Sequence, residues 1–331
     1  MNPEADMRRP LSLKTLKRGL RLAARVAKAE LPRLKPPLPA APPLPGRLVE
    51  FPAFGANPGK LRMLVHEPSG GEAPGRPLIV LLHGCGQQAA GFAEASGWIG
   101  LSDRLGIPLV LPEQASSNNG GRCFQWFEPA QTARGEGEAG SIAAMTQAAI
   151  TRFGSDPDRI FIAGLSAGGA MTAAMLAAYP DLFAAGAVVA GLPVGSANSA
   201  MQGLMRMASA APVARDEAVR QAAPQDYRGA WPHLSIWQGD ADDTVAPENA
   251  ERLAHQWQAL HGLPEAPVRD ETAAGVRHRT WGDALELWTL VGMGHGYPVG
   301  DGIGHTAPFM LDRGLPATAR IADFWRLTDT D

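Results

Sequence analysis

The apolar positions of this chain form short continuous runs that alternate with longer stretches of helical character. The continuous runs predict buried strands, and they lie at residues 61–66, 77–82, 108–112, 160–163, 183–190 and 234–237. Helical spacing or helix-favouring composition predicts helices at residues 91–105, 141–153, 170–178, 248–260 and 319–327. Because strands alternate with helices, we expect an α/β fold with a mostly parallel central sheet covered by helices on both faces.

Two segments depart from this alternation. Residues 277–281 and 284–291 read as consecutive strands joined at Gly282-Asp283, a dipeptide typical of a hairpin. Residues 192–230 are less regular, with a helical stretch near Ala218. We interpret them as a candidate insertion over the functional site.

The first 46 residues differ in composition from the rest of the chain. They carry 10 basic and 3 acidic side chains, a formal charge of +7, so the −3 of the whole chain leaves −10 on residues 47–331. Apolar residues from Leu13 to Ala27 recur at helical spacing, and a proline-rich stretch follows at 36–45. We predict an N-terminal extension over residues 1–46 and a catalytic domain over residues 47–331. For the extension, weak contact with an anionic or apolar surface and an unstructured tail are equally weighted alternatives.

Charge and hydropathy argue against nucleic-acid binding and against a membrane-spanning segment. The acidic body offers no electrostatic reason to bind nucleic acid, and no run approaches the roughly 20 apolar residues of a membrane span. The two cysteines, Cys85 and Cys123, fall short of a four-ligand zinc pattern, and the residues alone leave them free or paired. We therefore expect no metal and no organic cofactor, and the oligomeric state stays open.

The segment from Arg159 to Tyr179 carries the strongest chemical signal. A predicted strand is followed by Gly164-Leu165-Ser166-Ala167-Gly168, a G-x-S-x-G pattern, and then by a predicted helix. The glycines leave room for strand and helix to approach each other around a strained turn. We predict that Ser166 is a nucleophile at the helix N-terminus, where backbone N–H groups favour a developing oxyanion.

A serine nucleophile needs a histidine base and an acid that orients the base, in the α/β-hydrolase order serine, acid, histidine. Asp242 follows the strand that ends at Trp237, and His295 follows the strand that ends at Val291. Both positions lie beyond the carboxyl ends of strands, where open α/β sheets build their sites. We predict a triad of Ser166, Asp242 and His295.

Each choice has a competitor in the sequence. Asp240 and Asp243 flank Asp242, and we expect one of them to cap the helix that begins near Glu248. His305 follows no comparable strand, and we interpret His83 as structural. In α/β-hydrolases one oxyanion donor comes from the loop after the third strand and the other from the residue after the nucleophile. Here these are the loop 83–86 and Ala167, so we assign the backbone N–H groups of Cys85 and Ala167 as the oxyanion donors.

Several motifs together resemble the polyhydroxybutyrate-depolymerase-type esterase family, which includes feruloyl and acetylxylan esterase-like members. The motifs are His83-Gly84-Cys85-Gly86-Gln87, Cys123-Phe124-Gln125-Trp126-Phe127, Gly164 to Met171, Gly191-Leu192-Pro193, Gly239 to Val245 and Gly294-His295-Gly296. The resemblance implies an α/β-hydrolase fold, an acid at Asp242, a disulfide between Cys85 and Cys123, and a substrate wall near Trp126.

These observations predict a serine carboxylic-ester hydrolase that forms an acyl-enzyme. The ester would be of the polyester or hydroxyalkanoate type, or a short acyl or feruloyl ester. A thioesterase or peptidase with the same triad, and a catalytically silent surface-binding protein, stay open as alternatives. The resemblance implies an extracellular or periplasmic protein, whereas no standard secretory signal is evident in residues 1–46, which leaves a cytoplasmic location open.

Overall fold

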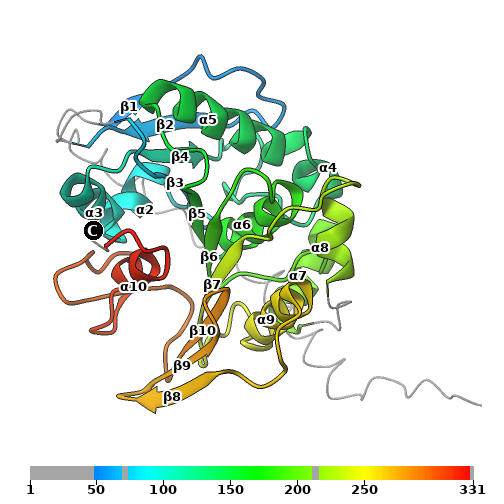
Figure 1. Ribbon diagram of the computed structural model, residues 1–331, viewed down its shortest axis with the longest axis vertical. Helices are drawn as coiled ribbons and strands as arrows, with labels where there is room; N and C mark the ends of the chain where they lie inside the picture. The colour runs from blue at the N-terminus through cyan, green and yellow to red at the C-terminus, as the bar shows by residue number, and fades with distance from the viewer. Residues whose placement is uncertain (1–47, 69–73, 211–215, 329–331) are drawn as a thin grey trace, which may run out of the picture. The chain divides into compact units, whose positions relative to one another are not determined.

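The computed structural model describes residues 48–68, 74–210 and 216–328, and these contain a ten-stranded sheet (Figure 1). In spatial order its strands are β1 (Leu48–Glu50), β2 (Arg62–His66), β4 (Leu109–Glu113), β3 (Leu78–Leu82), β5 (Ile160–Leu165), β6 (Ala185–Val189), β7 (His233–Gly239), β10 (Leu285–Leu290), β9 (Val276–Trp281) and β8 (Arg269–Ala273). The run from β4 to β10 is parallel, and the remaining pairings are antiparallel. The predicted extension over residues 1–46 lies outside the described residues.

Helices cover both faces of this sheet (Figure 1). One face carries α5 (Gly137–Phe153), α6 (Ala167–Ala178), α8 (Glu217–Ala222) and α9 (Glu248–His261), and the other carries α2 (Ala89–Ala95), α3 (Trp98–Leu105) and α10 (Ala317–Phe324). Within β3, Val80 packs into the first layer, whereas Ile79 and Leu81 pack into the second. Both faces of β3 are buried, which explains its continuous apolar sequence and confirms the predicted architecture.

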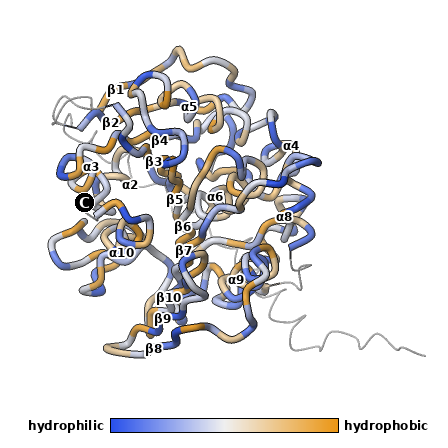
Figure 2. Tube along the Cα trace, viewed as in Figure 1, coloured by the Kyte–Doolittle hydropathy of each residue, from blue (hydrophilic) through white to orange (hydrophobic). Residues whose placement is uncertain are grey.

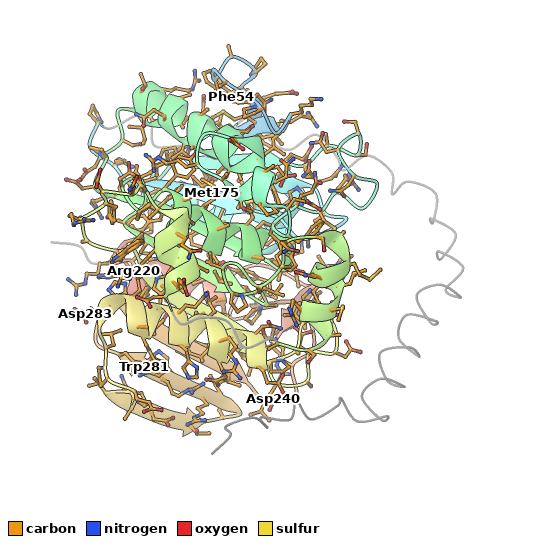
Figure 3. All side chains as sticks on the ribbon, turned by 90° about the vertical axis from the view of Figure 1, so that its right-hand side faces the viewer. Phe54, Met175, Arg220, Asp240, Trp281 and Asp283 are labelled. Carbon is orange, nitrogen blue, oxygen red and sulfur yellow. A yellow bond between two sulfur atoms is a disulfide. The ribbon has the colours of Figure 1, made fainter. Side chains whose placement is uncertain are left out.

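The helix α6 lies wholly inside the protein. All twelve of its residues are buried, and its small Gly and Ala side chains let the helix approach the sheet closely. Its Met175 lies among the core side chains in Figure 3, whereas Arg220 and Asp240 lie toward the periphery. Figure 2 shows the same contrast between an apolar interior and a polar periphery, with apolar residues concentrated in the strands between the two helical layers. A deeply buried α6 fixes the position of Ser166 at its N-terminus.

Three local expectations need correction. The predicted helix over 91–105 is two helices, α2 and α3, because Gly97 has a φ of 88° and a Cβ there would lie 2.6 Å from the Gly304 nitrogen. The helix predicted over 141–153 begins earlier, at Gly137. In the described part of segment 192–230, the expected helical stretch near Ala218 is α8, but a further helix, α7 (Ala200–Ala208), was not predicted.

The predicted hairpin is confirmed, since β9 and β10 pair antiparallel around Gly282, whose φ is 65°. The pattern did not predict α4 (Pro129–Thr132), the edge strands β1 and β8, or the small pair β11 (Tyr297–Val299) and β12 (Met310–Asp312). All of these are short or exposed, so they leave little periodic signal. None of the helices in the described ranges is long and apolar enough to cross a membrane.

Candidate active site

Ser166 occupies a sharp turn between β5 and α6. Its backbone has φ 56° and ψ −117°, a conformation that a residue with a side chain rarely adopts. The neighbouring glycines are sterically required, because a Cβ at Gly164 would lie 2.3 Å from the Gly168 oxygen. A Cβ at Gly168 would lie 2.2 Å from the Leu82 oxygen. The turn therefore has the strained strand–turn–helix geometry that the G-x-S-x-G pattern predicts.

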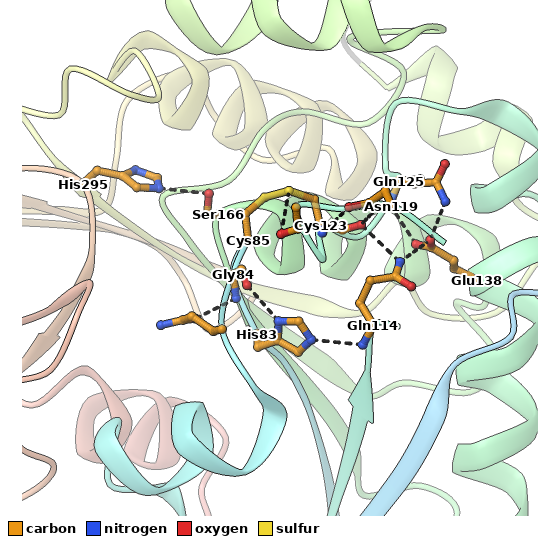
Figure 4. The surroundings of a disulfide bond; sticks show 12 residues. His83, Gly84, Cys85, Gln114, Asn119, Cys123, Gln125, Glu138, Ser166 and His295 are labelled. Carbon is orange, nitrogen blue, oxygen red and sulfur yellow. Dashed lines mark hydrogen bonds between the residues drawn. A yellow bond between two sulfur atoms is a disulfide. The ribbon is translucent and has the colours of Figure 1, made fainter. Parts of the chain in front are cut away.

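His295 lies in the loop between β10 and β11 and reaches back to this turn. Its Nε2 is 2.9 Å from the Ser166 Oγ, although the two residues are 129 positions apart in the chain (Figure 4). The side chain is almost completely buried. This hydrogen bond leaves the Ser166 hydroxyl in position to pass its proton to an imidazole nitrogen.

Asp242 lies in the loop after β7 and contacts the other imidazole nitrogen. Its Oδ2 is 2.8 Å from His295 Nδ1 and also accepts a hydrogen bond from Gln238 Nε2. Its Oδ1 accepts from the backbone N–H groups of Thr244 and Val245 at 2.9 and 2.8 Å. Burial by itself would raise the pKa of the Asp242 carboxyl, but His295 and these two amides outweigh burial and lower it. A carboxylate at this position holds the imidazole in the Nδ1–H tautomer.

The competing acids lie elsewhere. Asp240 accepts a hydrogen bond from the Gly292 N–H at 2.6 Å, and Asp243 is exposed. The expectation that one of them caps the helix near Glu248 is wrong, because the residue that precedes α9 is Pro247 and no side chain caps it.

The competing histidines also lie outside this constellation. His305 is exposed, and its backbone N–H donates to the Ala95 oxygen. His83 is fully buried, its Nδ1 lies 2.8 Å from the Gly84 oxygen, and its Nε2 accepts the Gln114 N–H at 3.1 Å. Burial lowers the pKa of His83, so the ring is neutral and structural, as predicted.

A disulfide joins Cys85 to Cys123, as the family resemblance implies (Figure 4). It ties the loop after β3 to the long loop after β4. The Gly86 N–H donates to the Gly121 oxygen at 2.8 Å and strengthens this attachment. The Gly84 N–H donates to Gln87 Oε1, also at 2.8 Å, so the loop holding Cys85 is fixed from both sides.

Sequence reasoning missed a buried carboxyl group behind this disulfide. Glu138 of α5 accepts hydrogen bonds from Gln114 Nε2 at 2.5 Å and from the Gln125 N–H at 2.8 Å (Figure 4). Burial raises the pKa of Glu138 to about 7, although these donors oppose the shift. The donors to the Glu138 carboxyl lie 24 and 13 positions earlier in the chain, so no local pattern could single it out.

Trp126 directly follows Gln125, whose backbone N–H and side chain donate to Glu138. It packs against a small apolar cluster made by Ala170, Leu192 and Val245. Ala170 follows Ser166 by one helical turn, and Val245 donates to Asp242, so Trp126 lies beside the elements that hold both residues. Within the described ranges, no group of three or more His, Cys, Asp or Glu side chains could hold a metal ion.

Comparison with known proteins agrees with the ester-hydrolase geometry of this site. A family model described as "Esterase PHB depolymerase" matches residues 61–279. The poly(3-hydroxyalkanoate) depolymerase C of Paucimonas lemoignei is 41% identical over 265 residues, which cover 78% of this chain and 63% of that protein. The present chain thus matches less than two thirds of the depolymerase. The acetylxylan esterase of Coprinopsis cinerea is 33% identical over 274 residues, covering 78% of this chain and 72% of that one.

A solved structure supports the assignment. The acetyl xylan esterase from Aspergillus awamori matches with a TM-score of 0.74 and 25% identity, covering 86% of this chain and 100% of that one. A match of this extent agrees with the α/β-hydrolase fold. The chain belongs to the PHB-depolymerase family of esterases, a family of serine carboxylic-ester hydrolases.

Proposed function

We propose that this chain hydrolyses carboxylic esters with Ser166 as nucleophile, His295 as general base and Asp242 as the acid that orients it. The observation that carries the proposal is the continuous hydrogen-bonded line from Ser166 Oγ through both nitrogens of His295 to Asp242 Oδ2. In this arrangement each member has the partner that its role requires. The family membership supports the same chemistry.

The reaction follows from this line of contacts. Ser166 Oγ attacks the ester carbonyl carbon while its proton moves to His295 Nε2, and the tetrahedral intermediate forms. The imidazolium, stabilised by the Asp242 carboxylate, gives the proton to the leaving alcohol as the C–O bond breaks. Water then attacks the acyl-enzyme by the same proton path, which releases the acid and restores Ser166.

The oxyanion of the intermediate would be held by the backbone N–H groups of Ala167 and Cys85. Ala167 is the first residue of α6, where the helix dipole favours negative charge. Cys85 lies in the loop that the disulfide and the Gln87 side chain immobilise. Within the described residues neither amide is found donating to another group, so both are free for a substrate oxygen. Because the donors are main-chain amides, immobilising the loop pre-organises them for the transition state.

For the substrate class we favour an apolar polyester over a sugar ester. The helix α7 places three large apolar side chains in solvent, those of Met201, Leu204 and Met205, with Met201 69% exposed. The buried face of α7 lies against Phe127, because a Cβ at Gly203 would lie 3.2 Å from that side chain. Phe127 in turn contacts Trp126, so α7 is attached to the segment that holds the candidate substrate wall, while its exposed apolar side chains face solvent. The depolymerase relative, by its name, acts on a poly(3-hydroxyalkanoate).

The proposal is tested with a fluorophosphonate label and a substrate panel. We expect the label to attach to the wild type at Ser166 and to fail with Ser166→Ala. p-Nitrophenyl butyrate should be hydrolysed faster than the matched acyl thioester and peptide anilide, which discriminates against the thioesterase and peptidase alternatives. Absence of labelling in folded wild-type protein would support a catalytically silent surface-binding protein instead.

A further inference from the structure

A tight turn at Ala307–Met310 places a phenylalanine where a glycine is expected. The Met310 N–H donates to the Ala307 oxygen at 2.9 Å, which closes a four-residue turn with Pro308 second and Phe309 third. Phe309 has a φ of 66°. Proline at the second position and positive φ at the third characterise a type II turn, in which the third position favours glycine or asparagine. The local backbone therefore argues against phenylalanine at this position.

Phe309 is also unfavourable on grounds of solvation. Its side chain is 46% exposed, so the residue combines a strained backbone with apolar surface left in water. A residue that contradicts both local rules marks a place where function, rather than stability, selects the side chain. The question is then what the ring faces.

The ring of Phe309 lies against the imidazole of His295. The two ring centroids are 6.0 Å apart with an interplanar angle of 78°, an edge-to-face contact. The backbone holds this arrangement firmly, because the Tyr297 N–H donates to the Phe309 oxygen at 2.7 Å. On the other side, Gln87 Nε2 donates to the Pro308 oxygen at 3.3 Å. The turn therefore bridges the histidine loop and the loop that carries Cys85.

We propose that Phe309 is a specificity-determining residue that contacts the alcohol portion of the ester, and that it favours alcohols with apolar surface. This inference rests on the proposed roles of Ser166 and His295. The imidazole must stand next to the oxygen of the departing alcohol to protonate it. A ring packed on that imidazole is adjacent to the alcohol group, whereas the acyl carbonyl is directed to the amides of Cys85 and Ala167.

The contact acts before the alcohol departs and has no role afterwards. During deacylation the alcohol is absent, since water attacks the acyl group on Ser166 with His295 as the base, so Phe309 should influence acylation and the choice of alcohol. It should leave the preference for acyl length at a fixed alcohol unchanged. This division separates a leaving-group contact from a general effect on the histidine.

The test compares kcat/KM for ethyl butyrate, benzyl butyrate and ethyl acetate in the wild type, Phe309→Ala and Phe309→Gly. Ethanol and benzyl alcohol are chemically similar leaving groups that differ in apolar surface. We expect both variants to reduce the benzyl-to-ethyl preference about tenfold, the lower end for an apolar pocket contact, while the butyrate-to-acetate preference stays constant. Val268→Ala removes another exposed apolar side chain, before β8, and should leave both preferences unchanged.

The glycine variant separates function from structure. Glycine adopts the φ of 66° without strain, so Phe309→Gly should melt at or above the wild-type temperature while losing the benzyl preference. A proportional loss on all three esters would show that Phe309 only positions His295. A changed acyl preference with an unchanged alcohol preference would place the contact on the acyl side. Either result overturns the inference, whereas loss of fluorophosphonate labelling in the wild type would instead overturn the proposed function.

Discussion

The Oδ2 of Asp242 lies 2.8 Å from His295 Nδ1, while its other oxygen is held by two backbone amides. These three hydrogen bonds fix both the orientation of the carboxylate and the tautomer of the imidazole. Asp242→Asn would present a neutral amide to the same ring and favour the wrong tautomer.

We therefore expect Asp242→Asn to lower kcat for p-nitrophenyl butyrate by roughly 10³–10⁴-fold with the fold preserved. The matched control is Asp243→Asn, because Asp243 is the exposed neighbour one position further along the chain. Its kcat should stay within about twofold of the wild type, as expected for a surface substitution. A severe effect of Asp243→Asn together with a mild effect of Asp242→Asn would contradict the assigned acid.

Reduction of the Cys85–Cys123 disulfide should lower both stability and turnover. The bond closes a loop of 38 residues, which corresponds to about 3–4 kcal/mol in the chain-entropy model. We expect the double variant Cys85→Ser and Cys123→Ser to unfold at lower denaturant concentration, and its kcat to fall because the Cys85 amide is less firmly held. Equal kcat in the oxidised wild type and the folded double variant would show that the bond serves stability alone.

The stability of the protein should depend on the protonation of Glu138. Its pKa is raised to about 7, above the roughly 4.3 of an unfolded glutamate, so the folded state favours the protonated form. Its stabilising contribution relative to Glu138→Gln is then complete below about pH 4 and is lost as the pH rises to about 7.

Urea unfolding at pH 5 and pH 8 checks this sign. We expect the difference in unfolding free energy, wild type minus Glu138→Gln, to become less favourable by roughly 2–3 kcal/mol on going from pH 5 to pH 8. Glu136→Gln, which alters an exposed glutamate two residues away, should show no such change. A difference that grows with pH would mean that the buried carboxylate is stabilised rather than penalised.

The exposed face of α7 should affect insoluble substrates selectively. Combining Met201→Ser, Leu204→Ser and Met205→Ser removes the apolar side chains that are open to solvent. We expect hydrolysis of a polyhydroxybutyrate film to fall about tenfold, because adsorption buries these side chains. Soluble p-nitrophenyl butyrate should be hydrolysed at nearly the wild-type rate. Val268→Ser is the control, and equal losses on film and soluble ester would argue against a surface-contact role.

Gly168 should tolerate no side chain. A Cβ there would lie 2.2 Å from the Leu82 oxygen and 2.5 Å from the His83 oxygen, both backbone atoms that cannot move independently. We expect Gly168→Ala to abolish activity and reduce the yield of folded protein. Gly100→Ala in α3 is the matched control, since nothing lies within 4 Å and alanine favours helix by about 1 kcal/mol. A fully active Gly168→Ala would contradict the close approach of α6 to the sheet.

The sequence alone was sufficient for features that depend on neighbouring residues. The turn at Ser166 requires glycines at 164 and 168, and both stand in one short motif flanked by a strand pattern and a helix pattern. The apolar runs predicted the central strands because a strand buried on both faces must be apolar throughout. The order of Ser166, Asp242 and His295, each after a strand, followed from the rule that parallel strands present their carboxyl ends at one edge.

Only the tertiary structure decided features that depend on groups distant in the chain. The backbone of Gly304 leaves no room for a side chain at Gly97, where the predicted helix breaks. Glu138 is held by Gln114 and Gln125 from another loop. The role of Phe309 depends on its approach to His295, which no periodicity can express. Local steric requirements and hydrophobic periodicity depend on residues close in the sequence, so they can be recognised before the structure is known. A buried carboxyl or a ring contact depends on residues far apart in the sequence, which meet only in the folded protein.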